Sequence, residues 1–169
     1  IVHRLDKDTS GLMVVAKTLP AMTALVRAIA AREVKREYQA IVHGRVAATL
    51  ASIDAPIGRD PVSRVRMAVV ASGKPARTDI ISRAAGNDRY SALWCRLHSG
   101  RTHQIRVHLA SRGHPLVADA LYGGASALGL ARQALHAARL GFMHPIGGQA
   151  LVFESPLAAD LAPAWALVA

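Results

Sequence analysis

Residues 90–113 have the sequence YSALWCRLHSGRTHQIRVHLASRG, in which a strand, a break and a helix are expected one after another. The aromatic and apolar residues of Tyr90–His98 predict a strand, and Ser99-Gly100 breaks that pattern. Residues at helical spacing then follow, namely Thr102, Ile105, Arg106 and Leu109. Gly113 stands where a helix is expected to stop. We therefore expect a helix over Arg101–Arg112, directly after a strand of a sheet.

Further strands and helices are predicted on both sides of this stretch. Apolar or alternating runs predict strands at Gly11–Lys17, within Lys35–Val46, and at Ala76–Arg83, Leu135–Pro145 and Gln149–Phe153. Apolar stripes predict helices at Leu19–Arg32, with Pro20 in its first turn, and at Pro156–Val168. Groups of strands with helices between them predict an α+β fold with a mixed, mainly antiparallel sheet and flanking helices.

The chain is expected to form one domain, because 169 residues match the usual size of about 100–200 residues. Ala47–Pro75 contains three prolines and the basic run Ser63-Arg64-Val65-Arg66. Apolar residues recur throughout it, so it is predicted to be a long excursion with short strands rather than a linker. Within Lys35–Val46, alternation places Tyr38 on one face of a strand, together with Ala40 and Val42.

Composition limits the classes of function. Lys and Arg number 21 against 11 Asp and Glu, giving a net charge of +10, which attracts polyanions such as nucleic acid. A generally arginine-rich composition explains the same excess equally well. We expect no membrane association and no secretory leader, because no apolar run approaches the ~20 residues of a membrane span and charge occurs at once. The single Cys95 favours a reducing, cytoplasmic location.

The densest polar cluster is His3-Arg4-Leu5-Asp6-Lys7-Asp8-Thr9-Ser10-Gly11. The neighbouring cations favour an ionised Asp6, which is a potential nucleophile. A solvated turn, in which Asp, Ser and Thr accept local backbone hydrogen bonds, is the alternative that local chemistry favours. The cluster also resembles the opening of a calcium loop, but Lys17 stands where that loop carries Glu, so we expect no metal site.

A second polar cluster is Gly100-Arg101-Thr102-His103-Gln104-Ile105-Arg106-Val107-His108. On a helix Thr102 and Arg106 share a face, although an ordinary surface ion pair is an equally simple role for Arg106. His103 and His108 lack the i, i+4 spacing of a helical zinc pair, so we expect them to be hydrogen-bonded in a packed polar layer. The sequence contains no Walker loop, dinucleotide fingerprint or nucleophile elbow, which disfavours nucleotide-driven phosphoryl transfer and hydride transfer.

Further short motifs accompany these clusters, namely Lys35–Ala40, Gly73–Thr78, Gly113–Pro115, Asp119–Gly123, Leu135–Ala137 and His144-Pro145. Together, and in this order, the motifs resemble the RluA-like family of RNA pseudouridine synthases from residue 1 to about residue 156. The resemblance implies a pseudouridine synthase-like α+β fold. Residues 1–169 would form a single catalytic domain that lacks the family's N-terminal strands and Lys-Pro motif.

The resemblance also implies roles for individual residues. Asp6 would be the nucleophile, and Arg106 would pair with it through a two-pronged guanidinium contact that keeps it ionised. Tyr38 would stack on the target ring and assist proton removal. Arg4 would occupy the place that the target nucleotide leaves, and Leu135 would line the pocket. Arg101 would contact the substrate. The residues expected to hold RNA phosphates are Arg64, Arg66, Lys74 and Arg77, although a solvated basic face is an equally simple role for each of them.

The implied reaction converts a uridine of structured ribosomal or transfer RNA to pseudouridine after the base is extruded from its stack. It needs no redox step, metal or group donor, so we expect no cofactor, and we expect a cytoplasmic monomer. One alternative is a non-catalytic RNA-binding module of the same fold. Another is a hydrolase of glycosidic bonds, for which Asp8 is the nearby second carboxyl group.

Overall fold

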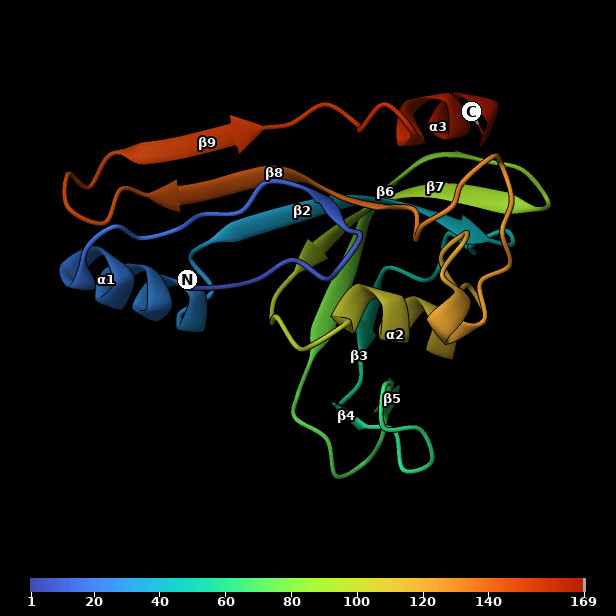
Figure 1. The fold of residues 1–169 in the computed structure, drawn as a ribbon, viewed down its shortest axis with the longest axis horizontal. Helices are drawn as coiled ribbons and strands as arrows, with labels where there is room; N and C mark the ends of the chain where they lie inside the picture. Colours follow the sequence, from blue (N-terminus) through green and yellow to red (C-terminus); the bar gives the residue numbers. More distant parts are fainter. Residues whose placement is uncertain (169) are drawn as a thin grey trace.

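The computed structural model describes residues 1–168, and within them a seven-stranded mixed sheet forms the centre of the molecule (Figure 1). Its strands are β1 (Ser10–Gly11), β2 (Lys35–His43), β3 (Ser52–Asp54), β6 (Arg77–Gly86), β7 (Tyr90–Leu97), β8 (Leu135–Met143) and β9 (Ala150–Glu154). They lie in the order β1-β8-β2-β7-β6-β3, with β9 also paired to β8. β1 runs parallel to β8, whereas the other pairings are antiparallel.

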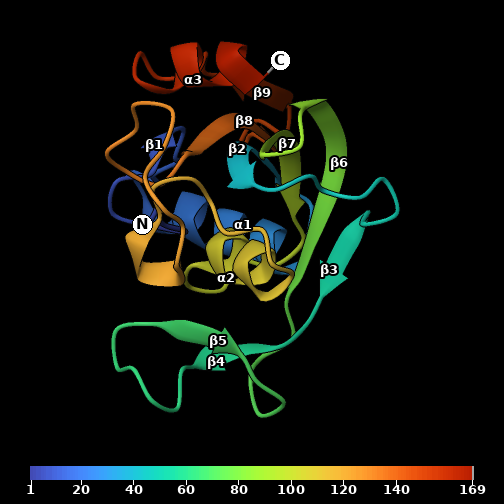
Figure 2. The same ribbon diagram turned by 90° about the vertical axis from the view of Figure 1, so that its right-hand side faces the viewer.

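Three α-helices accompany the sheet within the described residues, namely α1 (Leu19–Ala30), α2 (Gln104–Ser111) and α3 (Leu161–Val168). A 3-10 turn, η1, covers Ala120–Tyr122. Figures 1 and 2 show α1 and α2 on one side of the sheet and α3 on the other. This arrangement confirms the expected α+β class and mainly antiparallel sheet. None of the helices in residues 1–168 has the length and apolar character needed to cross a membrane.

Two hydrophobic cores lie on the two faces of β2, because its side chains alternate. Tyr38, with Ala40 and Val42, packs in the same core as Ile105 and Leu109 of α2. Ile41 points the other way and packs with Leu161 and Ala164 of α3. The predicted alternation of this strand is therefore confirmed.

The excursion after β2 forms a projecting arm. Its strands β4 (Ile57–Arg59) and β5 (Met67–Val69) pair as an antiparallel hairpin, which confirms the prediction of short strands in this segment. Figures 1 and 2 show the hairpin at the end of the molecule away from α3. Ile57 joins Val107 of α2 in a small third core, so the arm is anchored near that helix.

The strand predicted at Gly11–Lys17 is shorter than expected, because β1 ends at Gly11. β1 lies along the start of β8, opposite His136 and Ala137. From Arg139 onward the same edge of β8 is paired with β9. Since one strand edge holds one partner at each position, the chain after Gly11 has to leave the sheet.

Helix α2 begins at Gln104 rather than at Arg101. His103, just before it, has a left-handed backbone with φ of 56°. A left-handed residue cannot continue a right-handed helix. Thr102 therefore lies outside the helix, and the expectation that it shares a helical face with Arg106 is wrong.

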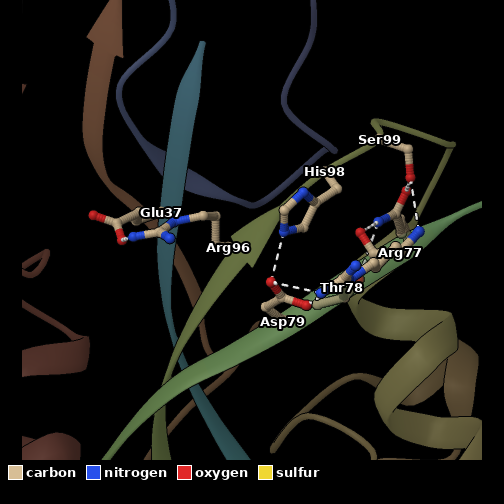
Figure 3. Close-up of polar contacts among 8 residues, drawn as sticks. Glu37, Arg77, Thr78, Asp79, Arg96, His98 and Ser99 are labelled. Carbon is tan, nitrogen blue, oxygen red and sulfur yellow. Dashed lines mark hydrogen bonds and ion pairs between the residues drawn. The ribbon is translucent and has the colours of Figure 1, made fainter. Parts of the chain in front are cut away.

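The Gln104 side chain ties the start of α2 to the sheet. Its carbonyl oxygen accepts hydrogen bonds from the Ser99 hydroxyl (2.8 Å) and the Arg101 N–H (3.1 Å). Its amide nitrogen donates to the backbone oxygen of Arg77 (2.8 Å). The Ser99 hydroxyl also accepts from the Arg77 N–H, as Figure 3 shows, so the turn before α2 is fixed to β6.

The final helix, α3, begins at Leu161 instead of the predicted Pro156. The elements at Leu19–Ala30, Tyr90–Leu97 and Leu135–Met143 match their predictions within a few residues.

α1 starts after Thr18, whose hydroxyl accepts a hydrogen bond from the Ala21 N–H (3.2 Å). Such a cap, with Pro20 in the first turn, is a typical start signal for a helix.

Candidate active site

Asp6 lies in a tight turn at the start of the sheet. Its backbone oxygen accepts a hydrogen bond from the Thr9 N–H (3.0 Å), and Asp8 within this turn has a left-handed φ of 67°. Gly11 closes the segment with φ of 112°, and a Cβ atom there would collide with the backbone of Ala137. The glycine therefore permits the close approach to β8 that places the turn, and the Asp6 side chain is 16% exposed.

Side chains from the segment before β8 hold this turn in place. Arg132 donates to the backbone oxygen of Asp8 (2.8 Å), to the Ser10 hydroxyl (2.9 Å) and to the carboxylate of Asp160 (2.8 and 3.0 Å). Gln133 donates to the backbone oxygen of Lys7 (2.6 Å). These donors bond to the backbone oxygens of the two central residues of the turn, so the residues before β8 hold the turn that carries Asp6.

Arg106 reaches Asp6 from the first turn of α2, but its two-pronged contact goes to a different carboxylate. Its Nε and Nη2 donate to the two oxygens of Asp119 at 2.8 and 2.9 Å. The third nitrogen, Nη1, lies 3.6 Å from Asp6 Oδ2. The expectation of a two-pronged pair with Asp6 is therefore corrected, because buried Asp119 occupies the two parallel donors that this geometry needs.

The environment of Arg106 favours its charged form. Burial opposes the charge, but the hydrogen bonds and charge of Asp119, and then the charge of Asp6, raise the pKa of Arg106. The ring of Tyr122 packs against the guanidinium, with 5.0 Å between its centroid and Cζ. A permanently charged, fixed guanidinium thus faces one oxygen of Asp6.

A cavity of about 270 Å³ opens beside Asp6. Five residues named from the sequence line it, namely Arg4, Asp6, Tyr38, Arg101 and Leu135. Tyr38 is 6% exposed, and burial raises its pKa to about 12, although the charge of Arg36 opposes this shift. The phenol is therefore protonated at neutral pH, and its ring forms an aromatic wall of the cavity.

The remaining predicted residues lie outside this cavity. Lys74 lines a second cavity of about 440 Å³, which the first adjoins through the shared residues Gly100, Arg101 and Thr102. Arg64 and Arg66 lie between β4 and β5 on the projecting arm. Arg66 pairs with Asp60 (3.0 Å) and Arg77 pairs with Asp79 (2.9 Å), so both of these guanidinium groups already have an acidic partner.

The two histidines of the second cluster have different environments. His108 is fully buried and hydrogen-bonds to Thr78 Oγ1 (2.8 Å) and to the backbone oxygen of Ala55 (2.9 Å), which confirms the expected polar layer. His103 instead lines the cavity, with Nδ1 2.6 Å from the Tyr122 hydroxyl. Burial lowers the pKa of His103, so its neutral ring can accept that hydrogen bond.

Asp119 and Arg132 are site residues for which no role was predicted from the sequence. Asp119 lies within the motif Asp119–Gly123. The available indication of its role was that a buried cation such as Arg106 needs a fixed anionic partner. Arg132 lies in no such pattern. Within residues 1–168, no group of three or more His, Cys, Asp or Glu side chains is placed to hold a metal ion.

Comparisons with known proteins point to one family. A family model described as RNA pseudouridylate synthase matches residues 1–111. The chain is 51% identical over 172 residues to "Ribosomal large subunit pseudouridine synthase D" of Nitrosomonas europaea, covering 96% of this chain and 49% of that protein. It is 54% identical over 162 residues to an "Uncharacterized RNA pseudouridine synthase" of Chloroflexus aurantiacus, covering 95% of this chain and 51% of that protein.

A solved structure has the same fold. "Human RNA Pseudouridylate Synthase Domain Containing 1" superposes with a TM-score of 0.80 at 30% identity, over 97% of this chain and 72% of that one. The chain spans about half the length of the curated relatives it matches.

Proposed function

This chain belongs to the RNA pseudouridylate synthase family, and from that premise we propose that it isomerises a uridine of large-subunit ribosomal RNA to pseudouridine. The observation that carries the proposal is the position of Asp6, which is fixed in a cavity between an aromatic wall and a buried arginine. The relative from Nitrosomonas europaea supports the choice of ribosomal RNA over transfer RNA, because its name contains "Ribosomal large subunit".

The reaction exchanges one bond for another within the nucleoside. The bond from uracil N1 to the sugar breaks, the ring turns, and a new bond forms from C5 to the same sugar carbon. C5 loses a proton and N1 gains one, so that atoms and charge balance without an external donor. We propose that Asp6 supplies the nucleophile that detaches the base and is released when the new bond forms.

Other residues at the site serve this step in the proposal. Arg106 keeps a fixed positive charge 3.6 Å from the Asp6 carboxylate. The ring of Tyr38 stacks on the uracil, and Leu135 closes the apolar side of the cavity. Because the phenol is protonated, it assists removal of the C5 proton as a relay: its oxygen takes that proton while its own proton passes to water. No cofactor takes part in this sequence of steps.

The target base must leave its stack to reach Asp6, because the carboxylate is largely buried. Extrusion of a base costs a few kcal/mol. We propose that Arg4 fills the vacated place. Phosphate contacts by Arg64, Arg66 and Lys74 outside the cavity, and by Arg101 in its lining, offset part of that cost. The chain acts in this proposal as a cytoplasmic monomer.

The test replaces the carboxylate. Large-subunit ribosomal RNA transcribed in vitro is incubated with the chain, and with a fusion that adds the part of the Nitrosomonas europaea relative outside the matched region, and pseudouridine is mapped. We expect Asp6→Asn to abolish conversion while RNA affinity stays within about threefold, since the substitution keeps the shape of the side chain. Turnover that survives in Asp6→Asn would refute the role of Asp6.

The same assay separates the alternatives. RNA binding without isomerisation, in both the chain and the fusion, would support a non-catalytic module. Release of free uracil would support a glycoside hydrolase. Pseudouridine formed in a transfer RNA transcript but not in the ribosomal transcript would reassign the substrate.

A further inference from the structure

Arg36 is a buried cation whose charge the described structure leaves uncompensated. Its residue is 6% exposed, and its Nε is buried without a hydrogen-bond partner. No ion pair in residues 1–168 includes it. An unpaired buried charge is strongly unfavourable, which makes this arrangement unusual for a purely structural side chain.

Two other arginines show what a structural role looks like. Arg83 and Arg96 also have a buried Nε without a partner. However, Arg83 donates through Nη2 to the backbone of Ala47 (2.5 Å), and Arg96 pairs with Glu37 (2.9 Å). Arg36 has no such acceptor among residues 1–168, and it lines the cavity that contains Asp6.

The surroundings of Arg36 hold the guanidinium in place without neutralising it. A Cβ atom at Gly100 would lie 2.7 Å from Nη1, so the group rests against backbone where a side chain would displace it. Burial, and then the charge of Arg36, lower the pKa of His3, whose Nε2 accepts the Val14 N–H at 3.0 Å. With Tyr38 protonated as well, Asp6 is the one acidic side chain among the described residues that line this cavity, and its ion pair is with Arg106 rather than with Arg36.

We propose that Arg36 is the binding site for a phosphodiester of the extruded nucleotide, inside the same cavity that receives its base. The inference rests on the proposed function. Arg36 and Tyr38 are two positions apart on β2 and line one cavity, so a base against Tyr38 has its own backbone within reach of Arg36. Phosphates are the permanently anionic groups of RNA, and a guanidinium binds them through two parallel hydrogen bonds.

The test measures RNA binding rather than turnover, so that it stands apart from the test of Asp6. In an Asp6→Asn background, the affinity for the large-subunit transcript is measured over a series of salt concentrations. We expect Arg36→Met to weaken binding about tenfold, as loss of a charged contact does. We also expect the salt slope to fall by about 0.7–0.9, the value for one phosphate. Arg36→Lys retains the slope, because it retains the charge.

The melting temperature of Arg36→Met and two further variants, Gly100→Ala and Arg45→Met, separate an effect on binding from an effect on folding. We expect Arg36→Met to melt at the same temperature or higher, because it removes an unpaired buried charge. Gly100→Ala pushes the flexible guanidinium aside without altering charge, and we expect it to weaken binding as well. Arg45→Met is the control, because Arg45 is exposed and pairs with Asp88 away from the cavity lining.

An unchanged salt slope in Arg36→Met would overturn the proposal. This includes the case in which turnover falls while binding holds, which would assign Arg36 to negative charge developing on the uracil instead. A lower melting temperature with an unchanged slope would also overturn it, in favour of a structural role. If the chain binds RNA as predicted here but forms no pseudouridine, the proposed function fails while the phosphate site stands.

Discussion

At the scale of single residues, two carboxylates share one guanidinium at the candidate site. Asp119 takes two donors of Arg106 at 2.8 and 2.9 Å, which leaves the third donor 3.6 Å from Asp6. The division has a chemical consequence. A carboxylate held by two short hydrogen bonds is a weak nucleophile, whereas Asp6 keeps its oxygens available beside a fixed positive charge.

Removing the charge of Asp119 is therefore expected to disturb Asp6 indirectly. In Asp119→Asn, Arg106 loses its fixed partner and is free to turn its paired donors to Asp6. We expect turnover to fall more than tenfold, and the free energy of unfolding to fall by about 2–3 kcal/mol, because a buried charged hydrogen bond is broken. Single-turnover kinetics and urea unfolding measure the two effects.

Asp88→Asn is the matched control, since Asp88 pairs with Arg45 at 3.5 Å on the exposed surface. Its unfolding free energy should change by at most about 0.5 kcal/mol. Full activity in Asp119→Asn would contradict a positioning role for Asp119.

At the scale of elements, the candidate site is assembled by contacts between segments far apart in the sequence. Arg132 reaches Asp8 across 124 positions, and Gln133 reaches Lys7 across 126. Local patterns predicted the elements with clear periodicity, such as α1 and β8. They could not predict the hydrogen bonds by which Arg132 and Gln133 hold the Asp6 turn, because nothing near Arg132 in the sequence indicates its partners.

The errors in element boundaries have the same cause. β1 ends at Gly11 because β9, which comes more than a hundred residues later, pairs with the rest of that edge of β8. Helix α2 starts at Gln104 because that side chain bonds to Ser99 and to Arg77 of β6. The cavity residues Asp6 and Tyr38 were found through a family resemblance. Local chemistry alone favoured a solvated turn around Asp6, and for Tyr38 it predicted only a place on one face of a strand.

The hydrogen bonds from Arg132 to the Asp6 turn lead to a prediction for this residue. In Arg132→Met the turn loses its bonds to the Asp8 backbone and the Ser10 hydroxyl, so the Asp6 carboxylate is held less firmly. We expect a loss of about 1.5–3 kcal/mol in unfolding free energy, typical of hydrogen bonds to charged groups, and a clear fall in kcat. RNA affinity should change little, because Arg132 does not line the cavity.

Asp160→Asn separates the ion pair of Arg132 with Asp160 from the hydrogen bonds of Arg132 to the turn. The substitution weakens the ion pair between Arg132 and Asp160, whose side chain is 49% exposed. It leaves the hydrogen bond from Arg132 to the Asp8 backbone in place. We expect kcat to remain near the wild-type value in this variant. Equal losses of kcat in Asp160→Asn and Arg132→Met would show that activity depends on the ion pair and not on the hydrogen bonds from Arg132 to the turn.

At the scale of the whole molecule, the net charge of +10 is spread over a body and a projecting arm. Figure 2 shows the β4–β5 arm extending away from the sheet, and the second cavity, with Arg59, Lys74 and Arg101, lies between the arm and the turn before α2. An RNA whose nucleotide enters the first cavity would therefore pass close to the arm. The arm's cations are suited to long-range attraction, which is screened by salt.

The two arginines at the tip of this arm should not contribute equally to RNA affinity. Arg66 is already paired with Asp60 at 3.0 Å, whereas Arg64 is exposed and is in no ion pair within residues 1–168. A phosphate contact by Arg64 releases a counterion without breaking an existing pair. We expect Arg64→Ala to lower the salt slope of RNA binding by about 0.7–0.9 and to weaken binding to all RNA sequences alike. Arg66→Ala should lower the slope by less. Binding titrations of both variants over a range of salt measure the difference, and a larger loss of slope in Arg66→Ala would mean that RNA displaces Asp60 from Arg66.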